Sequence, residues 1–186
     1  MNCYICGRTC SKDVIFANYI YWKCSNCFTS QVLPQPSSEN LQVYYARFHL
    51  REHVGGVYDD VEDRMKADFP TKVKMAMDYA KAANPRLLDV GCGKGFFVKA
   101  AVDSNIRAEG IDLSRSGIEY AVNTRGVKAT TGRIQDCNIK GWKESFDVVT
   151  LWATIEHLRD TISVIQAIHD CLKPGGVLLC DTGLQH

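Results

Sequence analysis

The sequence predicts an α/β fold: a parallel β-sheet with helices on both faces, preceded by a small cysteine-rich module. Two observations predict it. From Arg86 onward, apolar runs that suit buried strands alternate with helical patterns, and this alternation is typical of a parallel sheet covered on both faces. Two Cys-x-x-Cys pairs precede that pattern. We therefore divide the chain into a cysteine-rich module at 1–36, a linker and helical cap at 37–84, and an α/β core at 85–186.

Composition and charge narrow the classes of function. The 186 residues, 46% of them hydrophobic, suffice for one medium α/β domain and a small module. The formal net charge is +1 without a long run of one sign, which argues against a nucleic-acid surface and a polybasic membrane patch. No apolar run approaches the roughly 20 residues that span a bilayer, and no leader pattern follows Met1. We expect a cytoplasmic protein without nucleic-acid or membrane partners.

Four cysteines in the first module have the spacing of zinc ligands, as Cys3-x-x-Cys6 and Cys24-x-x-Cys27. Four thiolates suit tetrahedral Zn²⁺ and leave no open position for water, so we expect a structural rather than a catalytic ion. The metal would supply folding free energy that so small a module lacks. Disulfides or free thiols are the alternatives. Cys10 has a less regular spacing, and we expect it to be a surface or packed thiol.

The segment between the module and the core predicts two helices. A proline-containing linker at 33–38 is followed by a helical pattern that reaches Phe48. Its aromatic residues could line the mouth of a pocket, or they could pack on the core. A second helix is predicted to begin at Asp68, with Pro70 in its first turn, and to end near Asn84.

The core pattern predicts five strands and three helices. The strands are expected at 87–90, 108–111, 127–130, 146–152 and 177–180. The helices are expected at 96–102, at 114–124 with Ser114 as the cap, and at 160–172 with Asp160 at the start. Ligands of such sheets bind at the carboxyl ends of the strands.

The loop after the first core strand carries the candidate ligand-binding residues. Asp89 precedes three glycines on alternate positions, Gly91, Gly93 and Gly95, and glycine lets the backbone approach a ligand closely. The dinucleotide fingerprint needs a third glycine at a position that is apolar in this chain. A carboxylate before the loop would repel a pyrophosphate, but it suits a cationic ligand that carries an ammonium group.

These motifs resemble class I S-adenosylmethionine-dependent methyltransferases. Residues 89–95 are similar to that family's D-x-G-x-G-x-G signature, and the segments at 110–114, 132–136, 146–158 and 172–178 resemble further family motifs in the same order. The resemblance implies a Rossmann-like core that binds S-adenosylmethionine and methylates a small-molecule acceptor. The cysteine module is similar to zinc ribbons of methyltransferases associated with sugar and polysaccharide modification, which implies a sugar or polysaccharide precursor.

The resemblance also implies which residues bind the cofactor. They are Asp89, Gly91, Cys92, Gly93, Gly95, Asp112, Leu113, Ile134 and Asp136. Asp112 would accept hydrogen bonds from both ribose hydroxyls, which a carboxylate can do. Many relatives have an acid where this chain has Arg133. Asp136, or a backbone N–H near Ile134, would therefore contact the adenine.

His157 is the candidate general base, because the unperturbed pKa of histidine suits proton removal near neutral pH. Alternatively, His157 packs at the strand end and orients the loop. The same two roles, base or structural residue, are open for Glu156. His49 and His53 are rivals if their helix covers the pocket. Some quinone O-methyltransferases add a second glutamate to form a metal site. Ala153 stands at that position here, so we expect no bound magnesium.

The fifth strand is followed by few residues. The family core normally continues with a helix and an antiparallel strand pair, whereas this sequence ends at His186. We therefore expect the C-terminal strands to be missing and the sheet edge to be exposed, with a homodimer through that edge as one consequence. The alternative to an enzyme is a catalytically silent cofactor-binding module that acts through protein interaction.

Overall fold

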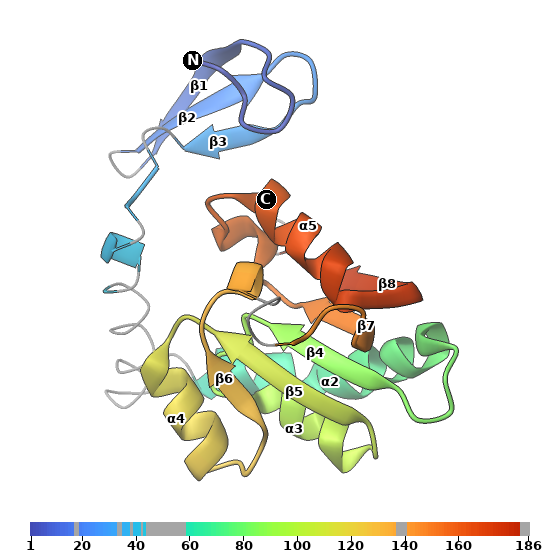
Figure 1. The fold of residues 1–186 in the computed structure, drawn as a ribbon. Coiled ribbons are helices and arrows are strands. Elements are labelled where there is room, and N and C mark those ends of the chain that lie inside the picture. The colour runs from blue at the N-terminus through green and yellow to red at the C-terminus, as the bar shows by residue number, and fades with distance from the viewer. Residues whose placement is uncertain are drawn as a thin grey trace. The chain divides into compact units, whose positions relative to one another are not determined.

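The computed structural model describes residues 1–16, 19–32, 35–37, 39–41, 43, 59–136 and 141–182, with the backbone alone for residue 16 and for 59–66. The chain forms two compact units, Met1–Asn40 and Leu41–His186 (Figure 1). Of the predicted helix that reaches Phe48, residues 39–41 and 43 are described and are helical, whereas 44–48, His49 and His53 lie outside the described residues. Among the described residues, no helix has both the length and the apolar character that crossing a membrane requires.

The first unit is a three-stranded antiparallel sheet in the order β1-β2-β3, formed by β1 (Cys10–Phe16), β2 (Tyr19–Cys24) and β3 (Ser30–Val32). The runs at 14–16 and 19–22, rich in β-branched and aromatic residues, lie in β1 and β2. β3 was not expected, because three residues with a single apolar side chain carry no readable alternation. The core of this unit consists of the buried cysteines Cys3, Cys10 and Cys24, with Trp22 packed against them.

The second unit contains a five-stranded sheet in the order β6-β5-β4-β7-β8 (Figure 1). Its strands are β4 (Arg86–Val90), β5 (Arg107–Asp112), β6 (Ala129–Thr131), β7 (Phe146–Leu151) and β8 (Leu172–Cys180). All four pairings are parallel, which confirms the predicted α/β fold. β4 is the central strand, and β6 and β8 form the edges.

Helices cover both faces of this sheet, as predicted. They are α2 (Asp59–Ala80), α3 (Phe96–Asp103), α4 (Arg115–Asn123) and α5 (Thr161–Cys171), with 3₁₀ turns η1 (Ile134–Asp136) and η2 (Ile155–His157). Neighbouring strand residues point to opposite faces. Leu87 therefore packs with apolar residues of α2, α3 and α4 in one core cluster, and Leu88 packs with those of α5 in a second.

The predicted starts of α2 and β8 were wrong, and α2 ends at Ala80 rather than near Asn84. α2 begins at Asp59 rather than at Asp68, so Pro70 lies inside the helix instead of in its first turn. A proline in a helix interior loses one hydrogen bond and disfavours the helix, but Phe69 and Val73 beside it are buried in the core. The burial of these side chains outweighs the preference of proline for the first turn of a helix. The carboxyl-terminal half of α2 therefore packs in the core of the second unit. β8 starts directly after α5 at Leu172, and not after the Pro-Gly-Gly segment.

Charges at the amino-terminal edge of the sheet neutralise one another across the strands. Glu109 of β5 is nearly buried, and its carboxylate pairs with Arg86 at 2.7 Å and with Lys128 at 2.6 Å. Asp147 of β7 accepts hydrogen bonds from Lys173 Nζ of β8 and from the backbone N–H of Arg86, both at 2.8 Å. Glu109 and Asp147 therefore already have partners within the fold.

Candidate functional site

Strand β4 places the glycine loop at the centre of the carboxyl-terminal edge of the sheet (Figure 1). Gly91, Gly93 and Gly95 have φ angles of 78°, 51° and 74°, in the left-handed region that other residues adopt at a cost. A Cβ on Gly91 would also lie 2.5 Å from the side chain of Thr154. The loop is thus shaped by the absence of side chains. Gly91 and Gly93 are half-buried at this edge, and their N–H groups donate within the fold to Ile111 and Asp112.

The end of the loop sets the position of α3. Gly95 is the N-cap of this helix, and a Cβ on it would lie 2.8 Å from the Cβ of Ala121 and 2.9 Å from Val127 Cγ2. The Cys92 side chain is only 8% exposed and packs in the core. Only the backbone of Cys92 can therefore take part in binding.

Asp112 at the end of β5 ties the glycine loop to the next strand. Its Oδ2 accepts from the backbone N–H of Gly93 at 2.9 Å, and its Oδ1 accepts from the N–H of Ser114 at 2.7 Å. Each carboxylate oxygen has two lone pairs, so Asp112 retains capacity for two hydroxyl donors of a ligand. Leu113, the next residue, is 41% exposed at the same edge.

Asp89 lies beneath the loop rather than on its surface. It is 4% exposed and accepts a hydrogen bond from Thr150 Oγ1 at 2.7 Å. Burial raises the pKa of Asp89 to about 7 despite that hydrogen bond, and the nearby charges of Asp112 and Asp181 act in the same direction. The carboxylates of Asp112 and Asp181 thus add to the effect of burial on Asp89, and the Lys72 ammonium opposes them. A cationic ligand would favour the ionised form of Asp89.

The segment after β6 lies beside Asp112. The N–H of Gly132 donates to the backbone oxygen of Asp112 at 2.9 Å, which holds η1 at the end of β5. Ile134 is buried in the core at 3% exposed. Asp136 is half-buried, with Oδ1 3.7 Å from the guanidinium of Arg133. The fold therefore brings both residues to the expected edge, with Asp136 the more accessible of the two.

The turn η2 after β7 carries His157 and Glu156. Both side chains are exposed, so His157 is not part of the apolar core. The backbone N–H of His157 donates to the oxygen of Thr154 at 3.0 Å, and Thr154 is the residue that abuts Gly91. η2 thus begins directly beside the glycine loop, where a base would have to act.

Two charged residues at this edge were not predicted from the sequence. Lys72 Nζ of α2 lies 2.8 Å from Asp181 Oδ2, just beyond β8, and 4.7 Å from the centroid of the Trp152 ring. Asp181 Oδ1 accepts from the backbone N–H of Ala153 at 2.7 Å. The sequence did offer one signal for Asp181, namely its position. It directly follows the last residue of β8, much as Asp112 is the last residue of β5.

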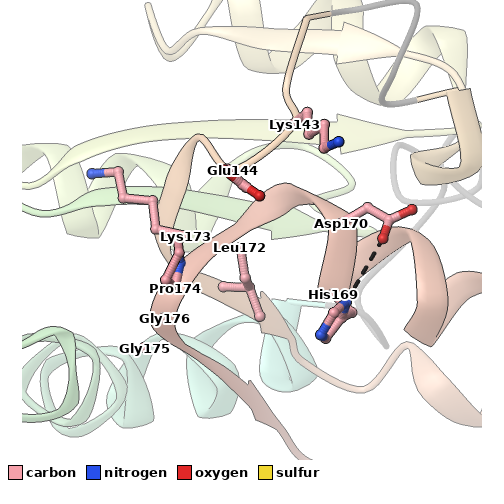
Figure 2. A pocket seen from close by; sticks show the side chains of 9 residues that line it. All are labelled: Lys143, Glu144, His169, Asp170, Leu172, Lys173, Pro174, Gly175 and Gly176. Atoms are coloured by element: carbon pink, nitrogen blue, oxygen red, sulfur yellow. Dashed lines mark ion pairs between the residues drawn. The ribbon is translucent and has the colours of Figure 1, made fainter.

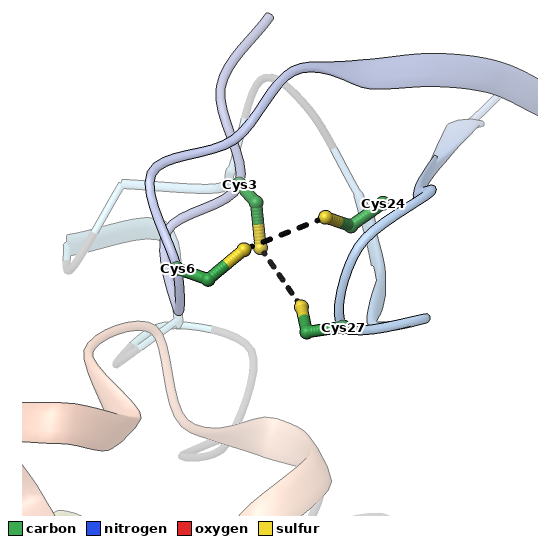
Figure 3. A group of neighbouring side chains, drawn as sticks. All are labelled: Cys3, Cys6, Cys24 and Cys27. Atoms are coloured by element: carbon green, nitrogen blue, oxygen red, sulfur yellow. Dashed lines mark hydrogen bonds between the residues drawn. The ribbon is translucent and has the colours of Figure 1, made fainter.

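The cysteines of the first unit converge as the spacing predicts. The sulfur atoms of Cys3, Cys6, Cys24 and Cys27 all lie within 4.8 Å of one another, and two of the pairs are 3.5 Å apart (Figure 3). Zn–S bonds of about 2.3 Å in a tetrahedron separate the sulfurs by about 3.8 Å. Hydrogen bonds from the side chain and backbone of Thr29 lower the pKa of Cys27 to about 6, whereas burial and the hydrogen bonds to Cys27 and Cys6 raise the pKa of Cys3 to about 11. The donor set therefore fits zinc.

Gln31 of β3 organises the surroundings of this cluster. It is 4% exposed, and its Nε2 donates to the backbone oxygen of Asn2 at 3.1 Å and to Cys10 Sγ at 3.6 Å. Its Oε1 accepts from the N–H of Tyr4 at 3.1 Å. Gln31 thereby holds both neighbours of Cys3, and Cys10 is a packed thiol beside the cluster, as expected.

The two cysteine turns have the same backbone design. The N–H of Gly7 donates to the oxygen of Cys3 at 2.9 Å, and the N–H of Phe28 donates to the oxygen of Cys24 at 3.0 Å. The residue after the second cysteine of each pair has a positive φ angle, 70° for Gly7 and 60° for Phe28. Phe28 is 72% exposed, so its side chain gains little packing in return for the strained backbone.

A hollow of about 310 Å³ lies elsewhere, where β7 and β8 begin (Figure 2). Its lining includes Glu144, Asp170 and Lys173, and His169 Nδ1 lies 3.6 Å from Asp170 Oδ1. This is the amino-terminal edge of the strands, opposite the glycine loop. Parallel sheets bind ligands at the carboxyl ends, so we place the ligand at the loop and not in this hollow.

A family model described as a methyltransferase domain matches residues 61–186. The chain belongs to this methyltransferase family. The Ubiquinone biosynthesis O-methyltransferase of Ruegeria pomeroyi is 33% identical over 114 residues, which are 54% of this chain and 42% of that protein. The chain spans about half the length of the curated relatives it matches.

Solved structures share the methyltransferase fold. A putative S-adenosyl-L-methionine-dependent methyltransferase from Methanococcus maripaludis aligns with a TM-score of 0.58 at 13% identity, over 76% of this chain and 64% of that one. Phosphoethanolamine N-methyltransferase 2 of Haemonchus contortus, solved in complex with S-adenosyl-L-methionine, aligns with a TM-score of 0.51 at 23% identity, over 62% of this chain and 29% of that one. At these identities the likeness concerns the fold alone.

Proposed function

We propose that this methyltransferase domain binds S-adenosylmethionine at the glycine loop and transfers its methyl group to a small-molecule acceptor. The observation that carries the proposal is the loop Gly91–Gly95, whose three glycines take left-handed φ angles at the carboxyl-terminal edge of the sheet, between Asp89 and Asp112. The cofactor carries a sulfonium and an ammonium group. Its positive charges suit an edge at which burial, together with the neighbouring carboxylates, raises the pKa of Asp89.

The remaining predicted residues would contact the ribose and the adenine of the cofactor. Asp112 would accept hydrogen bonds from the two ribose hydroxyls while it continues to hold Gly93 and Ser114. The exposed side chain of Leu113 and the segment at Ile134–Asp136 would border the adenine. The anchor of Gly132 on Asp112 keeps these two regions together.

When it is bound, S-adenosylmethionine supplies a methyl group that its sulfonium has already made electrophilic. The protein has to align the acceptor with the methyl carbon and exclude water. A base is needed if the acceptor is a hydroxyl, and we assign this role to His157, with Glu156 as its neighbour on η2. Replacing His157 by glutamine should lower turnover by about 10²–10⁴-fold and leave cofactor affinity unchanged.

We infer a hydroxyl group on a small molecule as the acceptor. The relatives named as O-methyltransferases support oxygen as the methylated atom. The resemblance of the first unit to zinc ribbons of sugar-modifying methyltransferases supports a sugar or polysaccharide precursor as the molecule that carries it. An acceptor screen with sugar nucleotides and with catechol-type phenols would decide between these two classes.

We also propose that Cys3, Cys6, Cys24 and Cys27 bind one structural Zn²⁺. Four cysteine ligands close the coordination shell, so the ion would hold the two cysteine turns together and take no part in methyl transfer. Measuring one zinc per chain, and the loss of the β1–β3 sheet on chelation, would test this.

Calorimetric titration of the zinc-loaded chain with S-adenosylmethionine tests the central proposal. Asp112→Ala should weaken binding by about 1–3 kcal/mol, because charged hydrogen bonds are lost. Asp103→Ala, which removes an exposed acid at the end of α3, is the matched control and should bind as the unmodified chain does. A folded chain that binds no cofactor would overturn the proposal, and binding without turnover on any acceptor would favour a silent binding module.

A further inference from the structure

We propose that Asp181 is a positioning residue, which fixes the loop at Trp152–Thr154 against the glycine loop. The inference rests on the proposed function in so far as it assigns this loop to the cofactor edge. Asp181 lies just beyond β8, whereas the loop follows β7, so the contact joins the ends of two neighbouring parallel strands.

Asp181 uses its backbone and both carboxylate oxygens in this contact. Its N–H donates to the backbone oxygen of Leu151 at 3.1 Å, which extends the β7–β8 pairing by one step. Oδ1 accepts from the N–H of Ala153 at 2.7 Å. Oδ2 lies 2.8 Å from Lys72 Nζ of α2. The loop, the strand end and the helix are therefore joined through one side chain.

The loop needs such a restraint because its backbone is strained. Ala153 has a φ angle of 48°, a left-handed conformation that costs a non-glycine residue free energy unless its surroundings stabilise it. The accepted hydrogen bond comes from the N–H of this same residue. The carboxylate of Asp181 therefore acts where the chain would otherwise relax.

Lys72 fixes the carboxylate in turn. The Lys72 side chain is 15% exposed, and its ammonium group lies over the ring of Trp152. Trp152 itself is 8% exposed and packs edge-on against Phe97 of α3. The Lys72–Asp181 ion pair therefore rests against a buried aromatic ring of the core, which restrains its position.

The residue next to Ala153 contacts the glycine loop. Thr154 follows Ala153, and its side chain lies where a Cβ of Gly91 would have to be. The turn η2, with Glu156 and His157, begins directly afterwards. A shift of the loop would therefore change both the wall of the glycine loop and the position of the proposed base.

Four variants test this role. Asp181→Ala removes the acceptor and the charge, Asp181→Asn keeps an acceptor oxygen for Ala153, and Lys72→Met removes only the cation. Asp78→Ala is the control, because it breaks an exposed ion pair with Lys74 on the same helix α2 without touching the loop. Two measurements are made on each zinc-loaded variant of the 186-residue chain: amide hydrogen exchange at Ala153 and the affinity for S-adenosylmethionine.

Asp181→Ala should speed exchange at Ala153 and weaken S-adenosylmethionine binding by about tenfold, the range of one lost hydrogen bond to a charged group. Asp181→Asn should stay within about threefold of the unmodified chain, and Asp78→Ala should match it in both measurements. A purely structural role would not separate Asn from Ala in this way. If Asp181→Ala does not fold, Lys72→Met decides, since freeing the carboxylate should also speed exchange at Ala153.

Two results would overturn the inference: exchange at Ala153 that is unchanged in both Asp181→Ala and Lys72→Met, or an Asn variant that loses as much affinity as the Ala variant. Failure of the proposed function looks different. If the unmodified chain binds no S-adenosylmethionine, the function is refuted, while the exchange measurement still decides whether Asp181 holds the loop.

Discussion

Replacing Asp89 by asparagine should have opposite effects on stability and on cofactor binding. Asparagine keeps an oxygen that can accept from Thr150 Oγ1, at 2.7 Å in the native site, but it carries no charge. The buried carboxylate disfavours the folded state because burial and the neighbouring acids raise its pKa to about 7. The same charge should favour a cationic cofactor. The variant should therefore be more stable without ligand and bind S-adenosylmethionine more weakly.

The magnitude follows from the rise in pKa from 3.8 to about 7. At about 1.4 kcal/mol per pH unit, the ionised carboxylate costs roughly 4 kcal/mol above pH 7. The sign is that of a raised carboxylate pKa. The cost is absent below about pH 4, grows between pH 4 and 7, and is complete above pH 7. Asp89→Asn should thus raise the free energy of unfolding by roughly 4 kcal/mol at pH 8 and by about 1.5 kcal/mol at pH 5.

Urea unfolding of both proteins at pH 8 and pH 5, followed by circular dichroism, measures this difference. The transition to use is that of the second unit, which holds α2 to α5. Comparison at equal pH removes the contribution of those titrating groups that do not interact with Asp89. Asp103→Asn, at an exposed acid, should show no comparable gain. A variant that is less stable than the unmodified protein at pH 8, or a gain that does not grow with pH, would refute the reasoning.

Three further changes test other parts of the molecule. Gln31→Leu should weaken zinc binding by about tenfold in competition with a chelator, because a buried amide that holds both neighbours of Cys3 is lost. Burial alone would raise the pKa of Asp147, but hydrogen bonds from Lys173 and from the backbone of Arg86 bring it below its ordinary value. Asp147→Asn should therefore cost about 1–3 kcal/mol at pH 7 in urea unfolding, a difference that disappears as the pH falls below about 4. Phe28→Gly should raise the thermal midpoint of the zinc-loaded first unit, since glycine adopts its φ of 60° without strain. An unchanged or lower midpoint would show that the Phe28 side chain stabilises this unit.

The predictable parts of the structure are those that local patterns determine. The core strands are apolar runs between turn residues, and Ser114 and Asp160 cap α4 and α5 as expected, each accepting from a backbone N–H three residues later. Capping depends on neighbours in the chain, so one sequence is enough to read it. The glycine loop is predictable for the same reason, because positive φ angles at alternate positions leave a local signature.

The features that were missed depend on contacts between distant segments. Pro70 signals the start of a helix by itself, and only the packing of Phe69 and Val73 in the core shows that the helix continues on both sides of it. The pairing of Lys72 with Asp181 joins residues more than a hundred positions apart. No periodicity or motif connects them, and they come together only once the sheet has placed the end of β8 beside the loop after β7.

The central position of β4 also has a consequence for folding. β4 pairs with β5, which follows it closely, and with β7, which lies about sixty residues further along the chain. Closing the longer connection costs more chain entropy, so we expect it to be the slower step. Until it is complete, Asp89 lacks Thr150 and Gly91 lacks Thr154 beside it. A ligand of this edge would therefore stabilise only chains in which β7 has already docked. It could slow their unfolding, but it could not accelerate the step that creates its own site.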